Sequence, residues 1–111
     1  MRRRLGSFER AQVATGAAAP YNAVVALRLS GGVTAAGARR ALARLGRRHP
    51  ELVARIEGRG RRAEMVVDRD SPSLALTVVA RTGEDAWRKV VQDELAHRFD
   101  PATGPLARGV L

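Results

Sequence analysis

The chain has 111 residues, of which 45% are hydrophobic, so it can form one small domain or part of a larger one. It contains no cysteine, which excludes disulfides, thiolate nucleophiles and cysteine metal sites together. Its net charge is +9, and all of its 20 basic residues except Lys89 are arginine. This bias either reflects GC-rich codon usage or indicates an acidic partner. No apolar run follows the basic start, and no window is long enough to span a membrane, so the sequence predicts a cytoplasmic protein without membrane association.

The first part of the chain predicts an arm followed by a strand. Residues 1–20 contain small and turn-forming residues and predict an N-terminal arm. Residues 23–30 then alternate in a way that predicts a strand, because Val25, Leu27 and Leu29 share one face.

A helix is predicted over 35–48, with Thr34 as its N-cap. Its apolar stripe, expected to pack on a sheet, consists of Ala38, Ala41, Leu42 and Leu45. The opposite face carries the candidate partner-docking residues, which are Arg39, Arg40, Arg44, Arg47 and Arg48. This arginine face is either a solvated helix surface or a docking site for an acidic partner.

The second half of the chain predicts a hairpin, a strand, a helix and a final strand. Residues 52–57 and 63–67 flank a glycine-rich turn and predict the hairpin, and residues 74–80 predict the next strand. Thr82 and Asp85 have the spacing of a capping box. The helix that they begin carries an apolar stripe of Trp87, Val90, Val91 and Leu95. The last residues, 106–111, predict the start of a strand that looks interrupted at an apolar end.

The predicted order is therefore β-α-β-β-β-α-β, which indicates an α+β fold. We expect a two-layer sandwich in which two helices cover one face of a mixed β-sheet.

The chain carries no convincing catalytic or metal-binding set of residues. His49 and His97 each lie at the predicted end of a helix, where histidine commonly interacts with the helix dipole and the last carbonyls. Their spacing does not suit a metal, and no phosphate loop or nucleophile elbow is present. The few aromatic residues are too scattered for a nucleic-acid stacking surface, so nucleic acid is not an expected partner.

Four stretches, in order, resemble the beginning of the superfamily of chloramphenicol acetyltransferase, peptide-synthetase condensation domains and related carrier-dependent acyltransferases. They are Leu5–Arg10, Tyr21–Asn22 with the segment that follows, Arg48–Leu52, and Phe99–Arg108. The third is similar to the family's Arg-His-x-x-Leu-Arg motif, although Val53 stands in place of the final arginine. The fourth is similar to a Phe-Asp…Gly-Pro-Leu-x-Arg sequence that precedes the active-site strand.

The resemblance implies that residues 1–111 form part of the N-terminal lobe of a two-lobed acyltransferase of natural-product biosynthesis. Such an enzyme moves an acyl group from a thioester, on coenzyme A or a phosphopantetheine arm, to an alcohol or amine. No bound cofactor or metal is implied. The family's His-His-x-x-x-Asp motif is expected beyond Leu111, so no catalytic residue is assigned here, and we expect catalysis only with a complementary chain or segment that carries the motif.

Two further functions stay open at this point. The chain is alternatively a non-catalytic interaction module that uses its arginine face to bind an acidic protein such as an acyl or peptidyl carrier protein. A nonspecific nucleic-acid binder is the third and weakest interpretation. The sequence does not identify the donor, the acceptor or an ester or amide product, nor does it fix the natural length of the chain or its oligomeric state.

Overall fold

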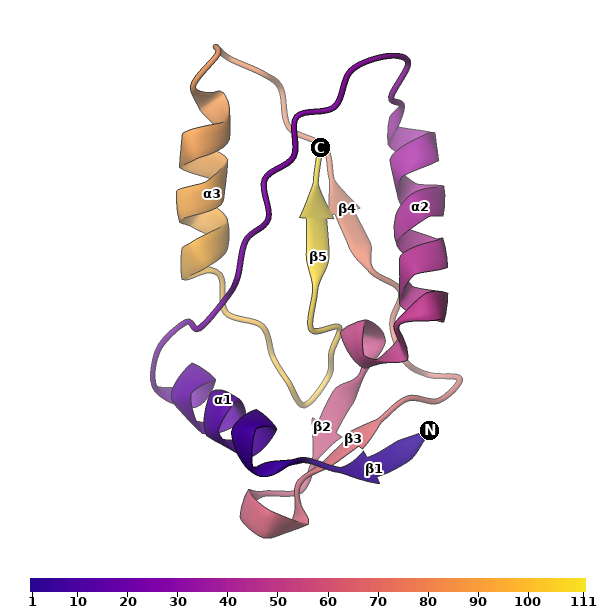
Figure 1. The fold of residues 1–111 in the computed structure, drawn as a ribbon, viewed down its shortest axis with the longest axis vertical. Helices are drawn as coiled ribbons and strands as arrows, with labels where there is room; N and C mark the ends of the chain where they lie inside the picture. The colour runs from indigo at the N-terminus through magenta and orange to yellow at the C-terminus, as the bar shows by residue number, and fades with distance from the viewer.

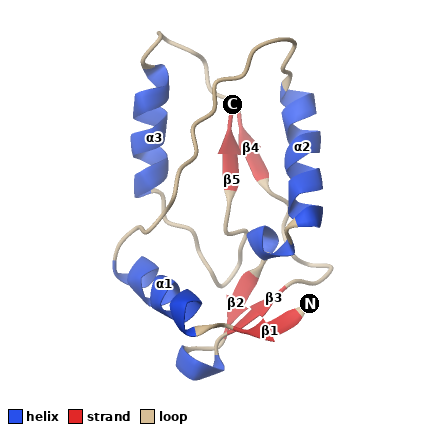
Figure 2. Ribbon diagram, viewed as in Figure 1, coloured by secondary structure: helices blue, strands red, loops and turns tan.

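The computed structural model describes residues 1–111 as an α+β protein with three α-helices and two small β-sheets (Figures 1 and 2). The helices are α1 (Ser7–Ala18), α2 (Ala35–Arg48) and α3 (Ala86–Ala96). The strands are β1 (Arg2–Arg4), β2 (Arg55–Glu57), β3 (Glu64–Val66), β4 (Ala75–Thr77) and β5 (Arg108–Val110), and two 3₁₀ turns lie at Pro50–Val53 and Gly60–Arg62. The α+β class is confirmed, but the single mixed sheet is not, because the strands form two separate sheets.

The first sheet is antiparallel, in the order β1-β3-β2. Ile56 of β2 and Arg3 of β1 lie opposite Met65 of β3. The predicted hairpin is therefore confirmed, with shorter strands than expected, because Leu52 and Val53 belong to a 3₁₀ turn instead.

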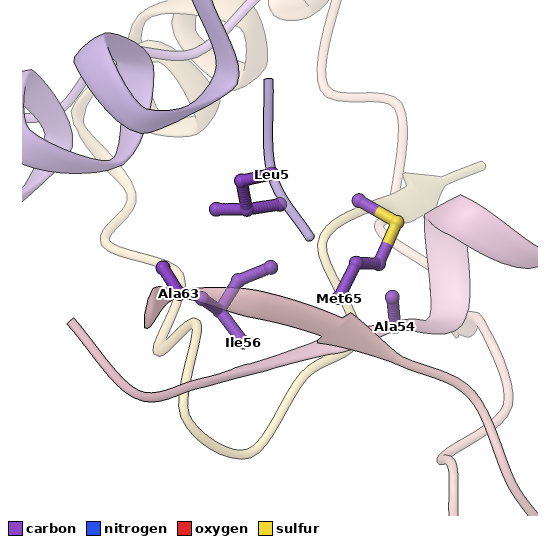
Figure 3. Packing of buried hydrophobic residues seen from close by; sticks show 5 residues of the cluster. All are labelled: Leu5, Ala54, Ile56, Ala63 and Met65. Atoms are coloured by element: carbon purple, nitrogen blue, oxygen red, sulfur yellow. The ribbon is translucent and has the colours of Figure 1, made fainter. Parts of the chain in front are cut away.

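The hydrophobic core lies on one face of this first sheet. Figure 3 shows its five buried residues gathered there: Leu5, Ala54, Ile56, Ala63 and Met65. Val13 of α1 packs against this cluster, so α1 covers the apolar face. The opposite face carries ion pairs between Arg2 and both Glu57 and Glu64, each at 2.8 Å. Ile56 and Met65 thus point to the face that carries the core, while Glu57 and Glu64 point to the other face, where Val66 is also buried.

The second sheet is a parallel pair, in which β4 continues through α3 into β5. Leu76 of β4 lies opposite Gly109 of β5. In Figure 1 the pair lies between α2 and α3. Leu42 of α2 approaches the Cβ position of Gly109 in β5, whereas the adjacent Arg108 binds Glu94 of α3. Because adjacent strand residues point to opposite faces, the expectation of two helices on one face is wrong. The strand predicted at the end of the chain is confirmed as β5, and the strand predicted over 74–80 is confirmed over Ala75–Thr77.

The arm predicted over residues 1–20 contains β1 and α1, two elements that were not predicted from the sequence. Strand β1 forms because the main chain reaches the free edge of β3, where the Val67 N–H donates to the Met1 carbonyl at 2.7 Å. At the start of α1 the Glu9 carboxylate accepts from the Gly6 N–H at 2.7 Å and thereby satisfies one of the free donors of the helix end.

The strand predicted over 23–30 is also absent. Residues 19–34 form an irregular connection that runs from α1 to α2 along the length of the molecule (Figure 1). Val25 and Leu27 are 81% and 76% exposed. The alternation that predicted a strand is present in the sequence, but no other part of the chain supplies a hydrogen-bonded neighbour.

No helix is both long enough and apolar enough to cross a membrane.

Candidate functional site

The arginine face of α2 is the first candidate site, and the helix that carries it has the predicted bounds. Thr34 is the N-cap, and its Oγ1 accepts from the Gly37 N–H at 3.0 Å. His49 ends the helix, and its N–H donates to the Leu45 carbonyl at 2.8 Å. The local sequence thus fixes both ends of the surface on which the arginines lie.

The side of α2 that faces the second sheet is narrower than predicted. A Cβ at Gly109 of β5 would lie 2.9 Å from Leu42 Cδ1, and Gly46 is buried against Val53 and Leu74. Leu45 is 41% exposed, and Ala41 is exposed as well. The expectation that these two residues pack on a sheet is therefore wrong, because the packed side of α2 follows the half-buried Ala38 and Leu42 and the buried Gly46, at a spacing of four residues.

All five predicted docking arginines are exposed, and none of them forms an ion pair. Three of them, Arg44, Arg47 and Arg48, line a shallow hollow together with the exposed Ala41 and Leu45. The ion pairs of the protein use other cations, namely Arg2, Arg3, Arg55, Arg88, Lys89 and Arg108. The arginine face is consequently a concentrated patch of uncompensated positive charge that borders the exposed Ala41 and Leu45.

The second candidate site is the junction at which two of the four motif-like stretches meet. The Leu106 N–H donates to the Leu52 carbonyl at 2.9 Å, which joins the Phe99–Arg108 stretch to the Arg48–Leu52 stretch. The Ile56 N–H donates to the Pro101 carbonyl at 2.6 Å, so the Phe99–Arg108 stretch is also hydrogen-bonded to β2. Val53, at the position where the similar motif has an arginine, packs toward Gly46 of α2.

The end of α3 connects a third motif-like stretch to this junction. The Asn22 side chain donates to the carbonyls of Glu94 and His97, at 3.0 and 2.6 Å. Arg108 binds the Glu94 carboxylate through two hydrogen bonds of 2.7 Å, and this pairing holds the pKa of Glu94 below its usual range. Asn22 and Arg108 are thus engaged in contacts that hold the connection, α3 and β5 together.

The first motif-like stretch lies at the other sheet. Leu5 belongs to the hydrophobic core, and the Arg10 guanidinium donates to the Leu5 carbonyl at 2.7 Å. Arg3 binds the Glu9 carboxylate at 2.7 and 2.9 Å and lowers the pKa of Glu9 to about 2. These contacts fasten α1 to β1.

The two histidines occupy separate helix ends. His49 Nδ1 lies 3.6 Å from a Glu51 carboxylate oxygen, and the His97 ring stacks edge-on against Phe99 with ring centroids 4.7 Å apart. No group of three or more histidine, aspartate and glutamate side chains is positioned to hold a metal ion. Neither of these contacts involves a hydroxyl group.

Comparison with protein-family models, curated proteins and solved structures gives no match for this chain.

Sequence reasoning missed the hydrogen bonds that hold the junction. Asn22 and Arg108 belong to motif-like stretches, but the partner of each lies on α3, in a part of the sequence that carries no motif. The only local signal was the acidic Glu94 on the predicted helix, and such a residue is equally common on a solvated face.

Proposed function

We propose that this chain forms part of the N-terminal lobe of an acyltransferase similar to chloramphenicol acetyltransferase and condensation domains. The observation that carries the proposal is the Leu106–Leu52 backbone hydrogen bond of 2.9 Å, which brings together two stretches that resemble the family's motifs. The motif-like residues Asn22 and Arg108 both bind Glu94 of α3, and β5 follows the Gly-Pro-Leu sequence after Ala107.

In this proposal the chain supplies scaffold, and the reacting groups come from the complementary part of the enzyme. A histidine of the His-His-x-x-x-Asp motif removes the proton of the alcohol or amine as that group attacks the thioester carbonyl. The tetrahedral intermediate collapses, the C–S bond breaks, and the thiolate leaves and takes up the proton. The new bond is an ester or an amide.

The small core supports a role as part of a larger fold. Only seven hydrophobic residues are buried, whereas twelve large hydrophobic residues are exposed. Exposed apolar surface of this extent commonly marks a surface that another polypeptide segment covers.

The test is mass spectrometry, under native and then denaturing conditions, of the protein isolated from the cells that make it. We expect a second polypeptide, or a longer continuous chain, that contains His-His-x-x-x-Asp, and this material should transfer acetyl from acetyl-coenzyme A or an acyl carrier to an amine or alcohol. A lone species of 12.0 kDa without transfer activity would overturn the proposal.

A second candidate function is the binding of an acidic acyl carrier protein to the arginine face of α2. The observation that favours it is that all five arginines are exposed and without an ion-pair partner. Charges of this kind raise association rates and favour partners of opposite charge.

Charge reversal tests the docking hypothesis. The triple variant Arg40→Glu, Arg44→Glu and Arg47→Glu should weaken binding of an acidic, phosphopantetheinylated carrier protein by about tenfold or more at low salt. The matched control is Arg59→Glu, Arg61→Glu and Arg62→Glu at the exposed hairpin tip, which changes the net charge equally. Equal affinities of the two variants would show that only net charge matters and would remove the docking site.

A further inference from the structure

Residues 23–30 have the sequence of a strand but none of its hydrogen bonds. No backbone N–H or carbonyl of this segment takes part in a backbone hydrogen bond within the chain. Eight consecutive residues therefore present free donors and acceptors along one continuous stretch. Such a stretch is a template for pairing with another extended chain.

The side chains of the same segment are equally uncovered. Val25, Leu27 and Leu29 are 81%, 76% and 60% exposed, and they alternate along the chain. In a strand these three side chains would line one face and would be covered together. The segment thus combines an unpaired backbone with an apolar face, which is what a protein presents when it binds a peptide by adding a strand.

We propose that Ala23–Ser30 binds an extended segment of an acidic polypeptide by β-strand pairing and becomes a strand when it does so. The partner segment carries apolar residues at alternate positions, which cover Val25, Leu27 and Leu29. It also carries a carboxylate next to Arg28. This inference is independent of acyl transfer, because it concerns an interaction surface and assigns no catalytic step.

The positive charge of the chain favours an acidic partner for this segment. Arg28 is exposed and has no ion-pair partner. Two copies of a chain with a net charge of +9 repel one another, which opposes self-pairing through this segment. An acidic polypeptide satisfies the backbone, the apolar face and Arg28 together.

The experiment measures amide hydrogen exchange of the full chain in the presence of short synthetic peptides. The probe is a heptapeptide of alternating glutamate and valine. One control peptide replaces valine with serine and keeps the charge, and another replaces glutamate with lysine and keeps the apolar face. We expect exchange over residues 24–30 to slow by about tenfold or more with the glutamate–valine peptide, and much less with either control.

A pair of proline variants tests whether the protection arises from strand pairing at this segment. Leu27→Pro removes one donor from a backbone that makes no hydrogen bond in the free protein, so the fold should persist by circular dichroism while the protection disappears. Ala80→Pro places the same change at an exposed loop residue whose own backbone groups make no backbone hydrogen bond, and this variant should retain the protection.

Four results would overturn the inference. They are the absence of protection at saturating probe, equal protection by the glutamate–serine or lysine–valine peptide, unchanged protection in Leu27→Pro, and protection that rises with protein concentration alone. The last result would indicate self-association. None of these outcomes depends on thioester chemistry, so the inference and the proposed function can fail separately.

Discussion

At the scale of single residues, Gly104 holds the junction in a conformation that other residues rarely adopt. Its φ is +63°, and a Cβ at this position would lie 2.5 Å from the Ala54 carbonyl oxygen. The carbonyl belongs to the backbone of a buried residue and cannot move away easily. Gly104 therefore permits the close approach that precedes the Leu106–Leu52 hydrogen bond.

We predict that Gly104→Ala lowers the free energy of unfolding by about 1–3 kcal/mol, through backbone strain and the clash with Ala54. Urea unfolding followed by circular dichroism measures the change. The control is Gly83→Ala, whose added Cβ meets nothing within 4 Å and whose φ is not positive. Equal unfolding midpoints for the two variants would contradict this role of Gly104.

The stability of the protein should depend on pH because several carboxylates are paired with arginine. Arg3 lowers the pKa of Glu9 to about 2, and Arg55 lowers the pKa of Asp68 to about 2. Because these values lie below those of the unfolded chain, the ion pairs contribute fully above about pH 5. Their contribution is lost as the pH falls through about 4 toward 2.

Glu9→Gln should therefore make the loss of stability below pH 5 shallower, because a glutamine has no proton to take up. Thermal unfolding at several pH values between 7 and 2.5 measures this slope. Glu84→Gln provides the control, since Glu84 is an exposed carboxylate without an ion pair. If Glu9→Gln leaves the slope of stability against pH unchanged and Glu84→Gln reduces it, the Arg3–Glu9 ion pair does not contribute to the pH dependence of stability.

At the scale of elements, the two predicted helix caps had different outcomes. Thr34 caps α2 as predicted, with its Oγ1 accepting from the Gly37 N–H. The capping box predicted from Thr82 and Asp85 is wrong, because α3 begins at Ala86 and the Asp85 side chain makes no capping hydrogen bond. The spacing of Thr82 and Asp85 fits a capping box, but the helix starts one turn later.

We predict that Thr34→Ala destabilises the protein by about 1 kcal/mol, whereas Thr82→Ala changes the free energy of unfolding by much less. The two substitutions remove the same atoms from exposed positions, so they form a matched pair in urea unfolding. A larger cost for Thr82→Ala would mean that α3 begins earlier than in the structure.

The sequence predicted the elements whose signals are local and missed those that depend on distant partners. The period of α2 and the glycine turn of the hairpin each lie within a short window, and both elements are present. Strand β1 has no strand pattern of its own and forms because β3 offers an edge. Residues 23–30 show the converse case, in which a strand pattern finds no partner within the chain.

The candidate sites also differ in whether local sequence patterns could predict them. Helical periodicity was sufficient to place the five arginines on one exposed face of α2. The contacts of Asn22 and Arg108 with α3 required the path of the whole chain, because residues 22, 94 and 108 are distant in sequence. The helical periodicity of apolar and charged residues does not indicate contacts between residues so distant in sequence.

At the scale of the whole molecule, the buried core is small and lies on one sheet. The five-residue cluster around Met65 is one contiguous group, whereas α2 buries only Gly46 and α3 buries no residue. A core of this size gives a small domain only a few kcal/mol of net stability. The first sheet with α1 should therefore be the most persistent part of the isolated chain.

We predict that Met65→Ala leaves the isolated chain largely unfolded at 25 °C. Met65 is 7% exposed and packs in the core with Leu5 and Ile56, and truncation of such a side chain costs about 2–5 kcal/mol. That loss is comparable to the whole net stability expected for a core of this size. The dispersion of a two-dimensional NMR spectrum measures the folded fraction. Val25→Ala is the control, because Val25 is 81% exposed and its truncation should leave the spectrum dispersed. A Met65→Ala spectrum as dispersed as that of Val25→Ala would show that the stabilising core lies elsewhere, in the contacts of α2 with β4 and β5.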